Sequence, residues 1–431
     1  MHKLSMIHFI KLNIVAVSVF FAGIVVCGLV SIPCYGQGVA LRAVSAVNEG
    51  MGGVATATPV DSIGALNWNA ATLSAFEKSD MSFGTSAILA NSEVSSQFLG
   101  RSGSTKSDTG AVLGPYMGMV MKDPEKRVTY GFGIFAIGGA QVNYPGDPSN
   151  PILNQTTGIG RTSAKVELFQ MVPAASFQIT DRLSVGLAPS SIVGRLIAEP
   201  MFFGPRDSTM TRWGQGAGTR YIWGAGFQIG AYYKGAGHMN YGFAFKSKQW
   251  TEKFPYNITF ADGSTTTAHF KLRYPSILTF GWSWDGLEKT ILGADIRYFD
   301  YSNALGFAEK GYHTDGSVKG LGWRSVWAVS VALQREITDR LTCRIGYSWN
   351  ENPITGETIL TNVPCPMIQQ HGLHLGATFE FLPEWYGTIG YAHMFESTVK
   401  GSNPLWSVDP NNSICSKASA DVISFGVNKS F

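Results

Sequence analysis

The amino-acid sequence predicts an all-β protein, a transmembrane antiparallel β-barrel of about 14 strands whose lumen is plugged by an N-terminal hatch. Three observations predict this fold. Apolar and polar residues alternate along many segments of the chain. The connections between these segments are short and long in turn, and the composition is low in charge and rich in glycine.

The composition suits a wall that faces lipid on one side and packs closely on the other. Only 15% of the 431 residues are charged, against about 25% in an average globular domain. Glycine accounts for 50 residues, and aromatic residues make up 12% of the chain. A net charge of +3 gives no basic stripe and argues against nucleic acid as a partner. No cofactor-binding fingerprint is present.

The N-terminus reads as an export signal. Residues 1–11 carry two lysines and no acid, and 12–30 form an apolar run. We therefore predict that residues 1–36 are a signal peptide cleaved near Gly36. The alternative is a retained helical anchor, since this run could just span a bilayer.

Strand-like alternation begins at Asp80 and is clearest over 341–350. Leu341, Cys343 and Ile345 share one face there, and polar or small residues take the other, which is typical of a membrane barrel strand. The predicted strands are 80–90, 111–121, 127–137, 164–179, 182–197, 221–233, 238–249, 271–284, 288–300, 323–337, 340–350, 371–382, 384–396 and 419–431.

The connections differ in length on the two sides of this predicted wall. Short ones include 180–181, 285–287, 338–339 and the single Pro383. Outer-membrane barrels have short periplasmic turns and long external loops, so an even strand number places both termini in the periplasm. A soluble β-sandwich or propeller would explain the alternation but not the one-sided loops. The predicted long loops are 91–110, 138–163, 198–220, 250–270, 301–322, 351–370 and 397–418.

The last predicted strand supports a barrel independently. Ile423, Phe425, Val427 and Phe431 share a face. An alternating strand with a terminal aromatic residue resembles the signal read by the outer-membrane assembly machinery, which we expect as a partner during biogenesis. Lys429, near the end on the outward face, can reach the interface.

Residues 37–79 show no strand period and are rich in small residues. A lumen of about 14 strands is too wide to be filled by wall side chains alone. We therefore predict that 37–79 form a plug inside a barrel made of 80–431.

Here the sequence resembles the FadL family of outer-membrane transporters, which includes the TodX-type hydrocarbon channels. The hatch of that family carries a Gly-x-Gly stretch, an acidic residue and an Asn-Pro-Ala motif, and this chain has Gly50-Met51-Gly52, Asp61 and Asn69-Ala70-Ala71. Ala70 stands where the family has proline, which leaves the local turn open. The resemblance marks Gly50, Gly52, Asp61, Asn67 and Asn69 as hatch residues. Further similar stretches follow in order at 144–146, 213–216, 292–295 and 337–353.

The resemblance implies passive transport of hydrophobic small molecules, either long-chain fatty acids or hydrocarbons. In this family a ligand adheres to external loops, enters a pocket and leaves sideways beside a kinked third strand. Gly138 and Gly139 are the candidate kink of that lateral gate, or they simply start the loop. The expected partners are the substrate and outer-membrane lipid or lipopolysaccharide, and the protein is expected to be a monomer. The alternative function is a structural or adhesive barrel, or a porin for polar solutes.

Two groups of residues are candidates for substrate binding. Phe202, Phe203 and Trp213 make the loop 198–220 apolar enough to be a landing site, unless they pack against a neighbouring loop. The second group comprises inward-facing arginines that either form a salt-bridge lattice between hatch and wall or pair with a substrate carboxylate. These arginines are Arg297, Arg324 and Arg344.

We find no catalytic or metal-binding constellation and predict that the protein is not an enzyme. His371 and His374 are three apart on a strand and therefore point to opposite faces. No serine, histidine and acidic residue share an obvious inward face. Cys365 and Cys415 fall in predicted outer loops and either form a disulfide in an oxidising compartment or remain free thiols.

Overall fold

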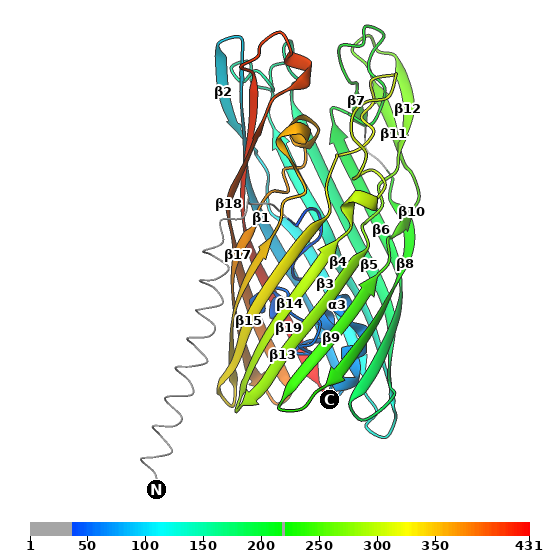
Figure 1. Cartoon of the computed structure of the whole chain (residues 1–431), viewed down its shortest axis with the longest axis vertical. Coiled ribbons are helices and arrows are strands. Elements are labelled where there is room, and N and C mark those ends of the chain that lie inside the picture. Colours follow the sequence, from blue (N-terminus) through cyan, green and yellow to red (C-terminus); the bar gives the residue numbers. More distant parts are fainter. Residues whose placement is uncertain (1–36, 218–219) are drawn as a thin grey trace. The chain divides into compact units, whose positions relative to one another are not determined.

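The structure, a computed structural model, describes residues 37–217 and 220–431. The predicted signal peptide, 1–36, lies outside the described residues. The described chain forms one antiparallel barrel with an N-terminal plug in its lumen (Figure 1).

Fourteen strands of the described chain form the closed wall, which confirms the predicted fold class. Each pairs with the next wall strand along the chain, and β1 pairs with β19 from Asp80↔Ser430 to Gln97↔Ser413 to complete the ring. Closure matters because an open edge in lipid would leave backbone groups without partners. The wall strands are β1 (Asp80–Phe98), β3 (Val112–Met121), β4 (Val128–Tyr144), β5 (Thr162–Gln178), β6 (Leu183–Glu199), β8 (Ile222–Lys234), β9 (Met239–Lys246), β13 (Ile277–Leu287), β14 (Thr290–Phe299), β15 (Val326–Thr338), β16 (Leu341–Asn350), β17 (His371–Leu382), β18 (Trp385–Gly401) and β19 (Ser413–Ser430).

The two ends of the barrel differ as predicted. At the short-turn end, tight connections join β13 to β14, β15 to β16 and β17 to β18. The turn predicted at 285–287 lies instead at 288–289, because β13 continues through a bulge to Leu287. Lys289 adopts the left-handed conformation in this turn, at φ 56°. Pro383 is likewise joined in its turn by Glu384, at φ 65°. The opposite, long-loop end carries all the long connections.

Side chains alternate between the two faces of the wall as the sequence predicts. On β16, Arg344, Gly346 and Ser348 are buried in the lumen, whereas the residues between them are partly exposed. Large apolar side chains such as Phe83 and Phe280 are 45% and 51% exposed on the outer face. An exposed belt of this kind is what a lipid-facing wall requires.

Several strands extend further into the long-loop end than predicted. β1, β4, β18 and β19 continue well beyond their expected ends, and β2 (Arg101–Lys106) forms a hairpin with the end of β1. The predicted strands 271–284 and 323–337 start late, at Ile277 and Val326. The loop before β13 instead contains β10 (Trp250–Thr251), β11 (Phe254–Thr259) and β12 (Thr265–Phe270), and β7 (Gln215–Ala217) pairs with β11.

The plug consists of three short helical segments that precede β1: α2 (Ala46–Gly50), α3 (Ser62–Trp68) and η1 (Ala70–Ala75). Each begins at a side chain that accepts from a backbone N–H of the first turn, namely Ser45, Asp61 and Asn69. Such caps satisfy N–H groups that have no partner within the helix. Nearly every plug residue from Ala43 to Leu73 is buried against the wall. Further one-turn helices lie in the loops: η2 (Tyr301–Asn303), η3 (Gly356–Thr358), α4 (Ile359–Asn362) and η4 (Pro404–Trp406).

Among the described residues, no helix is both long enough and apolar enough to cross a membrane.

Candidate functional site

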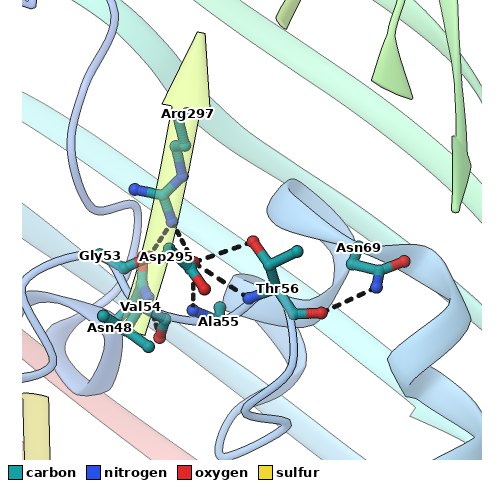
Figure 2. A network of polar contacts seen from close by, with 8 residues as sticks. All are labelled: Asn48, Gly53, Val54, Ala55, Thr56, Asn69, Asp295 and Arg297. Atoms are coloured by element: carbon teal, nitrogen blue, oxygen red, sulfur yellow. Dashed lines mark hydrogen bonds and ion pairs between the residues drawn. The ribbon is translucent and has the colours of Figure 1, made fainter. Parts of the chain in front are cut away.

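The plug is attached to the wall by a buried ion pair on β14 (Figure 2). The Oδ2 atom of Asp295 accepts from the backbone N–H of Ala55 at 3.0 Å, and from the N–H and hydroxyl of Thr56 at 3.1 and 2.8 Å. Arg297 donates to the same oxygen at 2.6 Å and to the carbonyl of Gly53. Both charged side chains are almost completely buried, so each depends on the other for stabilisation.

A second set of contacts surrounds Trp68 at the end of α3. The guanidinium of Arg297 lies 3.6 Å and the ammonium of Lys246 5.2 Å from the Trp68 ring, distances at which cation–π attraction operates. Lys246 also donates to Asn67 Oδ1 at 2.5 Å, and Gln228 donates to the Asn67 carbonyl at 2.8 Å. The predicted hatch residue Asn67 is therefore held by β8 and β9 together.

Ala70, which stands where the family has proline, is also held by Gln228. The Ala70 N–H donates to Gln228 Oε1 at 2.7 Å, a bond that proline could not make. Asn69, one residue earlier, donates to the carbonyls of Thr56 at 2.8 Å and Ala231 at 3.0 Å. This turn is therefore built from hydrogen bonds rather than from a proline ring.

The two hatch glycines allow α2 and the following turn to touch the wall backbone. A Cβ on Gly50 would lie 2.7 Å from the Cα of Gly376 on β17. Gly52 adopts φ +58°, and a Cβ there would lie 3.3 Å from the His374 ring. Asp61 lies in the plug interior, where it accepts from Ser45 and Gly64. Burial raises the pKa of the Asp61 carboxyl, and these two hydrogen bonds oppose the shift.

The expectation that no serine, histidine and acid share the lumen face is wrong. Glu49 on α2 is 3.1 Å from His374 Nδ1, and Ser348 Oγ is 2.8 Å from His374 Nε2. Sequence reasoning missed this set because Glu49 comes from the plug and not from a strand. All three side chains are buried, and together they form a third attachment of the plug, to β16 and β17.

A break in wall pairing lies beside the predicted kink. β3 and β4 are paired only from Tyr116↔Phe135 to Met121↔Tyr130. Above that point, β1 is the only described strand that pairs with 112–115 of β3, and β5 is the only one that pairs with 136–144 of β4. The Asp108 N–H donates to the Asn143 carbonyl at 2.8 Å at the upper limit of this stretch. We call this stretch the β3–β4 gap.

Gly138 and Gly139 lie at the gap, and they do not start a loop, because β4 continues to Tyr144. The β4–β5 register shifts between Ala136 and Gly138, which identifies a bulge. The plug contacts this bulge: Ala40 forms a bridge with Gly138, and the Leu41 N–H donates to the Ile137 carbonyl at 3.0 Å.

An apolar cavity of about 110 Å³ lies between the plug and the wall at this level. Residues 38–44 of the plug, Ile88 and Val112 are among its lining. A smaller cavity of about 20 Å³ shares Ile88 and Val112 and reaches Leu113 and Phe169, which belong to the outer face. The lumen cavity and the lipid-facing surface therefore approach each other through the β3–β4 gap.

Arg42 is the one cation of the described chain that lines the larger cavity. Its Nε and Nη2 donate to Asn350 Oδ1 at 3.1 and 2.7 Å, and Nη2 also donates to the Gln369 carbonyl at 2.6 Å. Glu49 lines the same cavity, so positive and negative charge occur together there.

The three arginines singled out in the sequence contact protein groups. Arg297 is paired with Asp295, and Arg344 donates to Gln334 and Thr378 at 2.7 and 2.6 Å. The placement of Arg324 on an inward strand face is wrong, because it precedes β15 and donates to the Asn352 carbonyl at 3.1 Å. Of the three, Arg297 has the salt bridge and the plug contact that the lattice alternative requires, whereas the contacts named for Arg344 and Arg324 are to neutral groups of the wall and loops.

The aromatic residues of loop 198–220 are packed against other loops. Phe202 is 3% exposed and meets Trp213 edge to face at 4.8 Å, and the Trp213 indole donates to the Gly316 carbonyl at 3.1 Å. Phe203 stacks on Phe270 at 3.6 Å and borders an open pocket of about 600 Å³. Of these three residues, Phe203 is the one that borders this pocket, where a solute at the long-loop end could reach it.

Cys365 and Cys415 are free thiols, so the disulfide alternative is not realised in the structure. Cys415 lies inside β19 opposite Ser95 and Lys400, not in a loop as predicted, whereas Cys365 packs against the central apolar core. Burial raises the pKa of the Cys365 thiol to about 12. No group of three or more potential metal ligands occurs among the described histidine, cysteine and acidic residues.

Residues 28–431 match the family model described as outer membrane protein transport protein (OMPP1/FadL/TodX). The chain belongs to this family. The resemblance seen in the sequence is thereby confirmed, and the family is one of outer-membrane transporters rather than enzymes. No curated protein is significantly similar in sequence.

Solved structures of the FadL/TodX family have the same fold as this member. The toluene transporter TodX of Pseudomonas putida is 15% identical with a TM-score of 0.65, over 91% of this chain and 99% of TodX. A FadL homologue of Pseudomonas aeruginosa is 16% identical with a TM-score of 0.69, over 92% and 100% of the two chains. The toluene transporter TbuX of Ralstonia pickettii is 16% identical with a TM-score of 0.65, over 91% and 99%.

Sequence reasoning missed several residues that hold the plug in this FadL/TodX family member. Gln228 and Lys246 could have been found, since they are long polar side chains on lumen faces otherwise rich in small residues. Tyr116 could not, because its hydroxyl accepts from the Ala46 N–H at 3.1 Å and donates to the Phe425 carbonyl at 3.1 Å, both far away in sequence.

Proposed function

We propose that this protein conducts small hydrophobic molecules, about the size of one aromatic ring, passively across the outer membrane. The molecule would occupy the apolar cavity beside the plug and leave sideways through the β3–β4 gap into the bilayer. The observation that carries the proposal is the adjoining pair of cavities at that gap.

Cavity size supports a small substrate over a long-chain fatty acid. A cavity of about 150 Å³ lined by apolar side chains binds benzene, and the lumen cavity is about 110 Å³. A fatty acid would need both a longer cavity and a cation that is not already engaged. Arg42 favours the fatty-acid alternative, but its contacts with Asn350 and Gln369 and the nearby Glu49 count against it.

The contact of Ala40 and Leu41 with the β4 bulge supports a gating role for the plug. These residues cover the stretch of β4 that β3 leaves unpaired. Displacing them would expose backbone groups at the bulge and widen the path to the outer face. In this view 37–79 are part of the transport path, 80–431 are the barrel, and 1–36 are a cleaved leader.

The loop lengths support one orientation of the barrel. We place the long-loop end outside the cell and the short-turn end, with both termini, in the periplasm. Phe203 at the long-loop pocket is the candidate first contact for the solute. The remaining proposed partners are surrounding lipopolysaccharide and the assembly machinery, with the protein acting as a monomer.

The test is uptake of labelled toluene and labelled oleate by cells that lack the gene and carry defined variants. Gly114 and Gly139 line both cavities and have room for a side chain, so Gly114→Leu and Gly139→Leu should obstruct the gap. Gly110→Leu is the matched control, since nothing lies within 4 Å of its Cβ position.

We expect toluene uptake to depend on the protein, to fall in both gap variants and to stay unchanged in the control. Wild-type uptake by the gap variants would refute the lateral path. Uptake of oleate but not toluene would refute the small-substrate assignment, and equal leakage of a polar sugar would favour the porin alternative.

A further inference from the structure

Part of the wall continues beyond the lipid-facing belt as a polar sheet. It consists of β2 and the long-loop ends of β1, β18 and β19, which rise together in Figure 1. Its inner face is buried, with Val94 and Ile414 in a separate apolar core. The outward side chains of these strands are exposed or partly exposed.

The outer face changes character sharply along the strands. Apolar residues occupy it up to Leu89 on β1 and Ile423 on β19. Beyond them the outward positions of β1 are Asn91, Glu93, Ser95 and Gln97. Those of the neighbouring strands are mostly polar as well, apart from Phe395 in the β18 bulge, which is 43% exposed, and Cys415 on β19. Polar wall above an apolar belt is where a barrel meets lipid headgroups.

Three lysines gather on this polar face. Lys417 on β19 and Lys106 on β2 both lie directly opposite Glu93, one on each side of β1. Lys400 on β18 lies one step further out, opposite Cys415. Residues opposite each other in a strand pair point to the same face, and all three lysines are exposed. Within the described chain, none of them has a carboxylate within salt-bridge distance.

The strand register gives the height of these lysines above the short-turn end of the barrel. Glu93 and Lys417 lie thirteen residues above the pair Asp80↔Ser430 at the short-turn end. At about 3.3 Å per residue and a tilt of about 40°, that is about 33 Å along the barrel axis. The apolar belt of such barrels is about 25 Å tall, so the lysines stand at the level of outer-leaflet headgroups.

We propose that this face binds the phosphate groups of lipopolysaccharide in the outer leaflet, with Lys106, Lys400 and Lys417 as the phosphate ligands. Ammonium groups are well suited to phosphate oxygens, and the surrounding hydroxyl side chains can bond sugars. The placement rests on the orientation given under the proposed function, whereas the site itself is separate from the transport path. A lysine on an edge strand also discourages strand addition. Lys106 and Lys400 lie on the two edges of this polar sheet, whereas Lys417 lies on the inner strand β19, where that role does not apply.

The test measures binding of purified protein to phosphorylated rough lipopolysaccharide and to the same material after enzymatic dephosphorylation. The variant is K106Q/K400Q/K417Q. The matched control, K253Q/K310Q/K319Q, removes the same charge from exposed lysines in other long loops. Heat-modifiable migration on gels verifies that each variant is a folded barrel.

We expect the triple variant to bind phosphorylated lipopolysaccharide at least tenfold more weakly, since one lysine near an anionic surface contributes about fivefold. The control should bind like the wild type, and E93Q should bind more tightly because it removes the one acid between the lysines. Equal binding by the two triple variants, or of the two lipopolysaccharides, would overturn the proposal. Toluene uptake by K106Q/K400Q/K417Q should stay normal, which separates this proposal from the transport proposal.

Discussion

Replacing Asp295 by asparagine should loosen the plug while leaving the barrel closed. The substitution keeps the size of the side chain but removes the charge that offsets Arg297. Arg297 is 2% exposed and would be left with neutral partners only, namely the Gly53 carbonyl, the amide oxygen at position 295 and the Trp68 ring. Removing one partner of a buried ion pair costs about 3–5 kcal/mol.

The lost free energy should make the plug separate locally from the wall more often, because the hydrogen bonds accepted by Asp295 join the plug to β14. The amides of Ala55 and Thr56 both donate to Asp295. At about 1.4 kcal/mol for each factor of ten, a loss of about 3–5 kcal/mol makes opening about 100- to 4000-fold more frequent. Hydrogen exchange of peptides covering 48–57, followed by mass spectrometry, measures this directly.

Two variants make the measurement decisive. Asp181→Asn alters an exposed turn carboxylate that pairs with Arg127 at 3.6 Å, and it should leave exchange of the plug unchanged. In the double variant Asp295→Asn/Arg297→Gln, the arginine substitution should cost less free energy than it costs in the otherwise wild-type protein, because the ion pair is already broken. Plug exchange in Asp295→Asn that matches the wild type would refute the attachment role of the ion pair.

Other substitutions and reagents probe separate contacts. Gly50→Ala should cost about 1–3 kcal/mol of stability through overlap with the wall backbone, visible as a lower urea midpoint; an unchanged midpoint would mean that the plug can shift freely. Ala70→Pro should cost about 1–3 kcal/mol by leaving Gln228 without its donor, whereas Ala70→Gly keeps the N–H, adds no buried group and should cost less in the same titration. At pH 8 the Cys365 thiol, with its pKa raised to about 12, stays protonated and should react with iodoacetamide more slowly than Cys415; a peptide map containing a disulfide between the two would contradict the structure.

The wall was predictable because lipid on one side and a packed lumen on the other impose period-two alternation. Where that contrast disappears, prediction fails. Residues 91–98 of β1 are polar on the outer face above the belt, so their strand character was missed. The opposite error occurs at 271–276, where apolar residues of a packed loop imitate a strand that begins only at Ile277.

The plug was predictable as a unit but not in its contacts. Small residues and a lack of period marked 37–79, yet the bond from Thr56 to Asp295 joins positions 239 residues apart. Alternation placed Asp295 and Arg297 in the lumen without saying which plug atoms they meet. Nothing in the sequence around Gly138 distinguishes a bulge within a strand from the start of a loop, since only the register with β5 does so.

The seam between β1 and β19 also governs how the barrel is made. Asp80 and Ser430 are 350 residues apart, and their strands must meet along eighteen paired positions. Contacts of such separation form slowly, because closing a long loop costs entropy before any bond repays it. Because the chain is synthesised from its N-terminus, β1 is made first and its partner last. Between these events β1 has an unpaired edge in an aqueous compartment, so the chain needs protection from aggregation until its final strand has been delivered.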